Sequence, residues 1–163
     1  MITKFRIDDR LLHGQVAYSW RSALSYDAIV IADDKASKDD IRRMAIKMCC
    51  PDGVNLAIRS ISDAAVLLKN PKLANMKVFV ICANPKSLYE LLNLITERAS
   101  VNLGGMQMEE GKTMFSPAVY VSEEDLKYLD DIESMGINIE VQEVPSKGIK
   151  SYSDLRKKVS FNK

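Results

Sequence analysis

The sequence predicts a single α/β domain with an open, mainly parallel, twisted sheet and helices on both faces. Short β-rich runs alternate with segments of helical periodicity along the chain, which is typical of this class. The length of 163 residues suits one domain with a sizeable core. Hydrophobic residues make up 47% and charged residues 28%, which is ordinary globular usage. We expect the domain to span residues 1–163, with a polar and basic tail over 146–163.

The first half of the chain shows the alternation clearly. A β-rich run is followed by an apolar stripe at helical spacing, and a continuous apolar run then predicts a buried strand. The pattern repeats twice more before the middle of the chain. In order, we expect a strand at 5–7, a helix at 16–24, a strand at 28–33, a helix at 39–48, a strand at 54–59 and a helix at 62–68.

The second half continues in the same way, and local residues support its boundaries. Asn84 caps a helix that has Pro85 in its first position, while Ser122 caps a later helix that Gly136 ends. The apolar strand before Asn84 has no alternation, which suits a central strand covered on both faces. In order, we expect a strand at 78–83, a helix at 85–98, strands at 101–105 and 118–122, a helix at 123–134, a strand at 138–144 and a short helix at 153–159.

Charge, hydropathy and cysteine usage exclude several classes of protein. The formal net charge of +1 provides no global field that would attract nucleic acid or an anionic membrane. The longest apolar run, Ala28 to Ala32, is far shorter than a membrane-spanning helix, so we expect a cytoplasmic protein. Three cysteines, two of them adjacent at Cys49 and Cys50, fit neither a disulfide framework nor a zinc site, which predicts reduced thiols.

Two stretches fit the regular pattern poorly, and both follow a predicted strand. One runs from Asp8 to Gln15, and the other begins at Gly104-Gly105-Met106 and continues to Pro117. In open α/β sheets the ligand site forms outside the carboxyl ends of the strands, at a switch point of the topology. These two loops are therefore the first places where we expect a functional site.

The first loop combines residue types that suit phosphate chemistry. His13, the only histidine, offers an imidazole nucleophile, and Arg10 offers a planar fork to phosphate oxygens. Gly14 lets the backbone approach an anion at a helix N-terminus. Either Asp8 or Asp9 could hold the imidazole in one tautomer. A lone histidine is nevertheless more often a capping or packing residue, and a loop arginine is usually a solvated charge, so the residues alone leave both interpretations open.

A family resemblance extends this interpretation. The run from Arg6 to Val16 closely resembles the N-terminal signature of the IIB proteins of the mannose/fructose/sorbose family of bacterial sugar phosphotransferase systems. The resemblance continues through Ala32-Asp33-Asp34, through Pro51 to Val54, through Asn102 to Met106, and through the acidic helix that starts at Glu123. It covers nearly the whole chain before the tail.

The resemblance implies a phosphoryl carrier. In this family the histidine takes a phosphoryl group from a phosphohistidine on a IIA protein or domain and passes it to a sugar carried by the membrane components IIC and IID. No metal or organic cofactor is implied, and selectivity for the sugar would reside largely in the membrane partners. His13 would be phosphorylated through Nδ1, with Arg10 as the phosphate clamp. The remaining assignments are backbone N–H groups around Gly14 and Gln15, Asp9 as the orienting group, and Gly105 in the second wall.

Three other interpretations compete with this one. A signalling receiver domain would carry an acceptor aspartate after the third strand, but that strand runs into Arg59 and Ser60. A nucleotide-binding module would need a glycine-rich phosphate loop, and neither common motif follows the first strand. A phosphocysteine mechanism would need an anion-binding loop beside a thiol, whereas Cys49, Cys50 and Cys82 lie in helix and strand patterns.

Overall fold

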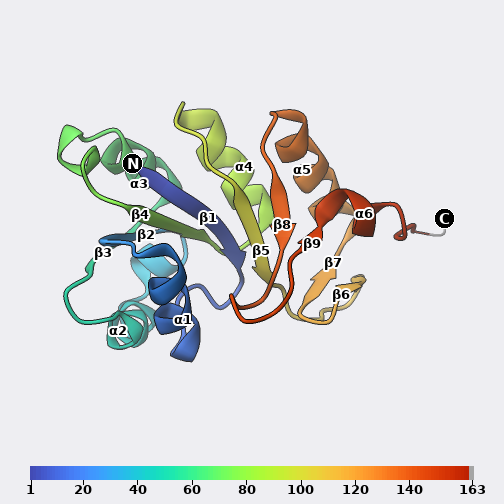
Figure 1. Ribbon diagram of the computed structural model, residues 1–163, viewed down its shortest axis with the longest axis horizontal. Coiled ribbons are helices and arrows are strands. Elements are labelled where there is room, and N and C mark those ends of the chain that lie inside the picture. The colour runs from blue at the N-terminus through green and yellow to red at the C-terminus, as the bar shows by residue number, and fades with distance from the viewer. Residues whose placement is uncertain (162–163) are drawn as a thin grey trace.

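The computed structural model describes residues 1–161, and a seven-stranded sheet forms its centre (Figure 1). The strands are ordered β3-β2-β4-β1-β5-β8-β9, and all neighbouring pairs are parallel except β8 with β9. This confirms the predicted open, mainly parallel sheet. The strands are β1 (Ile2–Asp8), β2 (Ala28–Ala32), β3 (Asn55–Arg59), β4 (Val78–Cys82), β5 (Val101–Gly105), β8 (Ile139–Val141) and β9 (Lys150–Ser151).

Helices cover both faces of the sheet, as the sequence predicts. One hydrophobic cluster joins α1 and α2 to the sheet through Trp20, Ile46 and Phe79. The other joins α3, α4 and α5 to the opposite face, through residues such as Ala64 and Leu91. The helices are α1 (Gly14–Leu24), α2 (Asp40–Cys49), α3 (Ile61–Leu68), α4 (Pro85–Leu94), α5 (Glu123–Ser134) and α6 (Tyr152–Arg156), with short 3-10 turns η1 (Ala36–Lys38) and η2 (Pro71–Leu73).

The N-terminal boundaries of two helices follow the expected chemistry, but one helix is shorter than expected. Asn84 accepts a hydrogen bond from the backbone of Ser87, and Ser122 forms a capping box with Asp125. The helix expected over 85–98 ends at Leu94, because Ile95 adopts an extended conformation and is buried in the core cluster. Burial of this side chain therefore prevails over continued helical periodicity.

The chain leaves the centre of the sheet in two directions. After β1 the chain runs through α1 to β2, which lies beyond β4 in the sheet. After β5 it runs to β8, which lies in the opposite direction from β1. β1 and β5 are neighbours, paired from Phe5 with Val101 to Asp8 with Gly105. Their carboxyl ends form the switch point at which open α/β sheets bind ligands. The two loops singled out in the sequence lie at this point.

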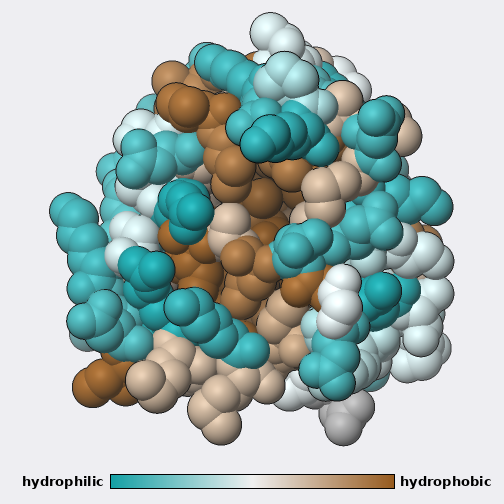
Figure 2. Space-filling model, turned by 90° about the vertical axis from the view of Figure 1, so that its left-hand side faces the viewer, coloured by the Kyte–Doolittle hydropathy of each residue, from teal (hydrophilic) through white to brown (hydrophobic). Residues whose placement is uncertain are grey.

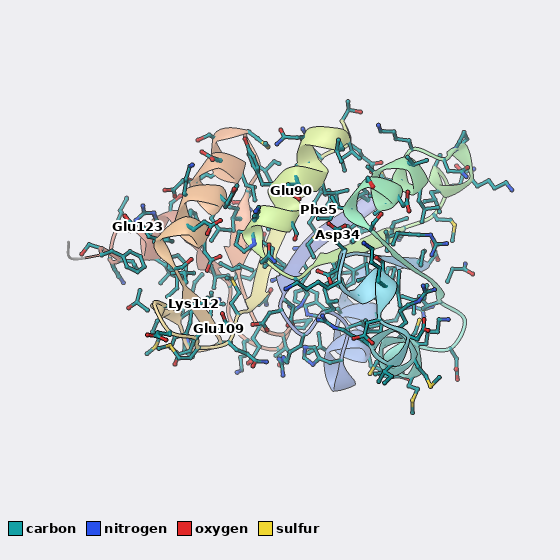
Figure 3. All side chains as sticks on the ribbon, turned by 180° about the vertical axis from the view of Figure 1, so that it is seen from behind. Phe5, Asp34, Glu90, Glu109, Lys112 and Glu123 are labelled. Carbon is teal, nitrogen blue, oxygen red and sulfur yellow. The ribbon has the colours of Figure 1, made fainter. Side chains whose placement is uncertain are left out.

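The region after β5 contains one strand, β6, that the sequence did not predict. β6 (Thr113–Ser116) and β7 (Val119–Val121) form a separate antiparallel hairpin, so the strand expected over 118–122 is not part of the main sheet. The segment before the hairpin is tied to α5, since Lys112 Nζ lies 3.8 Å from both Glu109 Oε2 and Asp125 Oδ2 (Figure 3). β7 lies within the strand expected over 118–122, whereas the interspersed polar residues of β6 gave no clear strand periodicity.

The expected tail joins the fold. β9 pairs antiparallel with β8, and Tyr152 at the start of α6 is fully buried, with its hydroxyl donating to Asp130 at 2.7 Å. α6 spans 152–156, shorter than the helix expected over 153–159, and residues 162–163 lie outside the described part. Within residues 1–161, none of the helices is long and apolar enough to cross a membrane.

The opposite edge of the sheet is more open. Figure 2 faces this side, where hydrophobic residues lie in a hollow rimmed by hydrophilic ones. β3 is the edge strand here, and its residues Leu56 and Ala57 are only half-buried. The two edges of the sheet therefore differ in how well they are covered.

Candidate functional site

The loop after β1 is held by a tight turn and by buried leucines. The backbone N–H of Leu11 donates to the carbonyl of Asp8 at 2.9 Å, which closes the turn and places Arg10 at its tip. Leu11 has a positive φ of 59°, a conformation that is costly for a branched side chain. Leu11 and Leu12 are 0% and 3% exposed, so their burial in the core holds the loop in this shape.

His13 lies at the N-cap of α1, where the chain enters the helix. Gly14, the next residue, has a φ of +40°, which disfavours any residue with a Cβ. In the described part of the chain no side chain caps the N-terminus of α1, whereas side chains of Asp39, Ser60, Asn84 and Ser122 cap α2 to α5. The backbone N–H groups of the first turn of α1 are therefore open to an anion.

The carboxylate that contacts His13 is that of Asp8. Asp8 Oδ2 lies 3.0 Å from Nε2 of His13, and the Asp8 side chain is fully buried while that of His13 is 23% exposed. The sequence left Asp8 and Asp9 as alternatives and the family resemblance favoured Asp9, so the geometry corrects that assignment. A register shift between Ile7 and Asp8 in the pairing with β5 accompanies this arrangement.

Asp9 instead joins the two loops. Its Oδ2 accepts a hydrogen bond from the backbone N–H of Gln107 at 2.7 Å, and its own N–H donates to the carbonyl of Gly105 at 3.1 Å. Arg42 of α2 donates to the Asp9 carbonyl at 3.3 Å. The structure thus brings together the two loops that the sequence singled out.

A buried polar network behind Asp8 escaped the sequence analysis. Arg6 donates through Nη2 to Asp8 Oδ2 at 2.9 Å and through Nη1 to Asn102 Oδ1 at 2.6 Å. Asn102 in turn donates to the Gln142 carbonyl at 2.9 Å. Arg6, Asp8 and Asn102 are all 0% exposed. The sequence feature that could have indicated this network is the presence of an arginine and an asparagine inside apolar strands.

The electrostatics of this network favour an ionised Asp8. Burial alone would raise the pKa of the Asp8 carboxyl, but hydrogen bonds from His13 and the Arg10 backbone, together with the charge of Arg6, lower it below its ordinary value. Burial also lowers the pKa of Arg6, against the opposing effect of Asp8. The lowered pKa of Asp8 makes this carboxylate a hydrogen-bond acceptor for His13 at neutral pH.

The other predicted residues surround this centre. The Arg10 side chain is 47% exposed, and its Nε lies 3.8 Å from Asp8 Oδ1, a long ion-pair contact that leaves the guanidinium facing solvent. Gly105 is buried and lines an open groove together with Asp9, Arg10 and Met106. Gln15 lies in the first turn of α1, and its side chain is outside what the structure describes.

The three thiols lie away from this arrangement. Cys49 and Cys50 are half-buried near the end of α2, and Cys82 is fully buried in β4. Burial raises the pKa of both Cys50 and Cys82, which disfavours the nucleophilic thiolate. The surroundings of these residues therefore do not favour a phosphocysteine mechanism.

Comparisons with known proteins identify the family of this chain. Residues 2–163 match the family model of the PTS system sorbose subfamily IIB component. The sorbose-specific EIIB component of Lacticaseibacillus casei is 34% identical over 144 residues, covering 88% of each chain. The mannose-specific EIIAB component of Escherichia coli K12 is 32% identical over 94% of this chain, which spans 48% of that relative. The crystal structure of the IIBSor domain of the Klebsiella pneumoniae sorbose permease superposes with a TM-score of 0.93, at 27% identity and 99% coverage of both chains.

Proposed function

This chain belongs to the sorbose subfamily of IIB components of sugar phosphotransferase systems, and we propose that it carries a phosphoryl group on Nδ1 of His13. The single observation that carries the proposal is the contact of 3.0 Å between Nε2 of His13 and Asp8 Oδ2. An ionised carboxylate only accepts hydrogen bonds, so Nε2 must carry the proton. The lone pair then resides on Nδ1, which is the nucleophilic nitrogen.

In the proposed step, Nδ1 attacks the phosphorus of a phosphohistidine on the donor. The new N–P bond forms as the donor's N–P bond breaks, and the donor imidazole leaves with the bonding electron pair. The proton on Nε2 stays in its hydrogen bond with Asp8, which offsets the positive charge that develops on the His13 ring. Phosphoryl transfer of this kind requires mainly alignment and charge stabilisation from the protein.

Two groups of donors would stabilise the equatorial oxygens. The half-exposed guanidinium of Arg10 lies at the tip of the loop and could hold two oxygens at once. The uncapped N–H groups of α1, including those of Gly14 and Gln15, would supply the helix-terminal anion site. Gly105 would form part of the second wall, through the groove that it lines with Arg10.

The proposed donor is a IIA protein or domain, and the proposed acceptor is a sugar held by the membrane components IIC and IID. The E. coli relative is named as an EIIAB component, which supports a IIA partner for this chain. His13 is 23% exposed on an open loop, which suits access by two partners in succession on the cytoplasmic side of the membrane. A deeply enclosed histidine would not allow this exchange.

The test is an intact-mass measurement after incubation with a phosphorylated IIA domain, for example that of the E. coli mannose relative. We expect the wild type to gain one phosphoryl group that is labile in acid and stable in base, and we expect His13→Ala to gain none. The matched control is the triple variant of Cys49, Cys50 and Cys82 to Ser, which should still accept the group. Phosphorylation of His13→Ala, or a folded triple variant that accepts nothing, would refute the proposal.

A further inference from the structure

The Arg6 side chain is fixed by contacts from both β5 and α1. Its guanidinium carbon lies 5.5 Å from the centre of the Trp20 ring, which comes from α1. A Cβ on Gly104 would lie 2.2 Å from that same carbon, so only glycine at 104 leaves room for the guanidinium beside the β5 backbone. Asn102 Oδ1 accepts from Nη1 at 2.6 Å, and the Gln142 carbonyl fixes the orientation of the Asn102 amide. The position of Arg6 is therefore determined by β5 and α1 together.

Arg6 and His13 share one oxygen of Asp8. Oδ2 accepts from Arg6 Nη2 at 2.9 Å and lies 3.0 Å from His13 Nε2, while Oδ1 accepts from the backbone N–H of Arg10 at 3.0 Å. With both oxygens held, the carboxylate has no freedom to rotate away from the imidazole. The orientation of the His13 ring thus depends on an arginine that does not itself reach the ring.

The energetics of burial favour a functional reason for this arrangement. A fully buried ion pair is costly to desolvate, and apolar residues of similar volume often give equal or greater stability. Arg6 and Asp8 are both 0% exposed, and Arg6 Nε is buried without a hydrogen-bond partner among the described residues. Packing of the sheet alone does not require such a pair at this position.

We propose that Arg6 is a positioning residue which, fixed by Asn102, Gly104 and Trp20, holds Asp8 against Nε2 of His13 and thereby directs phosphorylation to Nδ1 alone. The inference rests on the proposed function and adds a determinant of which nitrogen reacts. Arg6 touches neither the phosphoryl group nor its donor. It acts through Asp8, and loss of its fork would let the imidazole turn and present either nitrogen.

The test compares the site of phosphorylation in the wild type with that in two variants. Because His13 is the only histidine, long-range 1H–15N correlation spectra show one imidazole, and they distinguish a phosphoryl group on Nδ1 from one on Nε2. Arg6→Lys keeps the charge but loses the fork, and Asn102→Leu keeps the branched shape but removes the acceptor of Arg6 Nη1. The control is Gly148→Ala, whose added Cβ would meet no atom within 4 Å.

We expect only the Nδ1 product in the wild type and in the control. In both variants we expect a mixture of the two products and an acceptance rate lowered by up to about 100-fold, as for other small misplacements of reacting groups. The KM for the phosphorylated donor should change little, because the donor does not touch Arg6. Emission of Trp20, the single tryptophan, reports displacement of Arg6 in the same samples, and a urea melt reports folding.

The outcomes separate this inference from the proposed function. A folded variant that accepts at the wild-type rate on Nδ1 alone would overturn the role of Arg6 and leave the proposed function intact. A mixture of products in the wild type would overturn both the role of Arg6 and the assignment of Nδ1, and would leave only phosphoryl transfer through His13. Absence of phosphorylation in the wild type would refute the function itself. If neither variant folds, the wild-type protein still tests the inference. The NMR signals of the Arg6 side-chain N–H groups should then shift when His13 is phosphorylated. Unchanged signals would overturn the inference.

Discussion

The carboxyl ends of β1 and β2 carry the same pair of residues, two aspartates, in different surroundings. After β2, Asp33 Oδ2 accepts from the backbone N–H of Ala36 at 2.9 Å, and Asp34 Oδ1 accepts from the backbone N–H of Ile61 at 2.9 Å. These carboxylates stabilise a turn after β2 and the start of α3. Asp34 is labelled in Figure 3. After β1, Asp8 is instead surrounded by the side chains of Arg6 and His13.

The two pairs differ in the type of hydrogen-bond donor and in whether each carboxylate oxygen has its own partner. Asp9 has one oxygen, Oδ1, that is buried without a partner in the described part of the chain, and Asp8 shares a single oxygen between two side chains. Arg42 connects the pairs, since it donates to the Asp9 carbonyl at 3.3 Å and lies 3.9 Å from Asp33 Oδ2. Asp33 and Asp34 accept hydrogen bonds from backbone N–H groups, whereas Asp8 in addition contacts the side chains of Arg6 and His13, which makes it part of the candidate site.

The largest expected effect comes from removing the charge of one aspartate in each pair. Asp8→Asn should lower the rate of phosphoryl acceptance by about 10²–10⁴-fold, because an amide does not hold the required imidazole tautomer as a carboxylate does. Asp34→Asn, which keeps an oxygen for the N–H of Ile61, should change the rate by less than about threefold. Single-turnover transfer from a phosphorylated IIA domain measures both. Equal rates for the two variants would remove the distinction between the loops.

A second prediction compares an arginine from each loop region. Arg10→Lys should slow acceptance by about 30- to 1,000-fold, equivalent to about 2–4 kcal/mol, because an ammonium does not reproduce the planar fork. Its free energy of unfolding should change by less than about 1 kcal/mol, since the side chain is half exposed. Arg43→Lys is the matched control, because Arg43 donates to the Ser37 carbonyl beside the second pair.

Transfer assays and urea melts of both lysine variants test this prediction. Near-normal transfer by Arg10→Lys would reduce Arg10 to a docking or structural charge. A large loss of stability would show instead that its main contribution is to hold Asp8.

The smallest expected effect is a pH dependence of stability. The pKa of Asp8 is lower in the folded protein than its ordinary value of about 3.9, because the hydrogen bonds from His13 and Arg10 and the charge of Arg6 outweigh burial. The stabilisation from its ionised form is therefore complete above that ordinary value and is lost as the pH falls through the lower, folded value. Below about pH 4 the free energy of unfolding should fall more steeply for the wild type than for Asp8→Asn, by at most about 1.4 kcal/mol per pH unit for one proton.

Urea melts between neutral pH and the acid range measure this difference, with Asp34→Asn as the reference from the pair after β2. Parallel curves for the wild type and Asp8→Asn would contradict the lowered pKa of Asp8 in the folded state.

The class of fold and the location of the candidate site could be predicted from local sequence. Alternating β-rich and helical patterns predict the parallel sheet, because both periods repeat within a few residues and reflect burial of one or both faces. His13, Arg10 and Gly14 are neighbours in sequence at the start of a helix, so their proximity needed no tertiary information. The helix expected over 85–98 shows the limit of such patterns, since the burial of Ile95 ends it early.

Only the tertiary structure decided which aspartate faces the imidazole and what stands behind it. Asp8 and Asp9 are adjacent in sequence, but pairing of β1 with β5 directs Asp8 toward His13 and Asp9 toward Gln107. Arg6 and Asn102 are 96 positions apart and meet because those strands are neighbours in the sheet. Strand order is set by the packing of the whole core rather than by any local pattern, and the contacts that hold His13 depend on it.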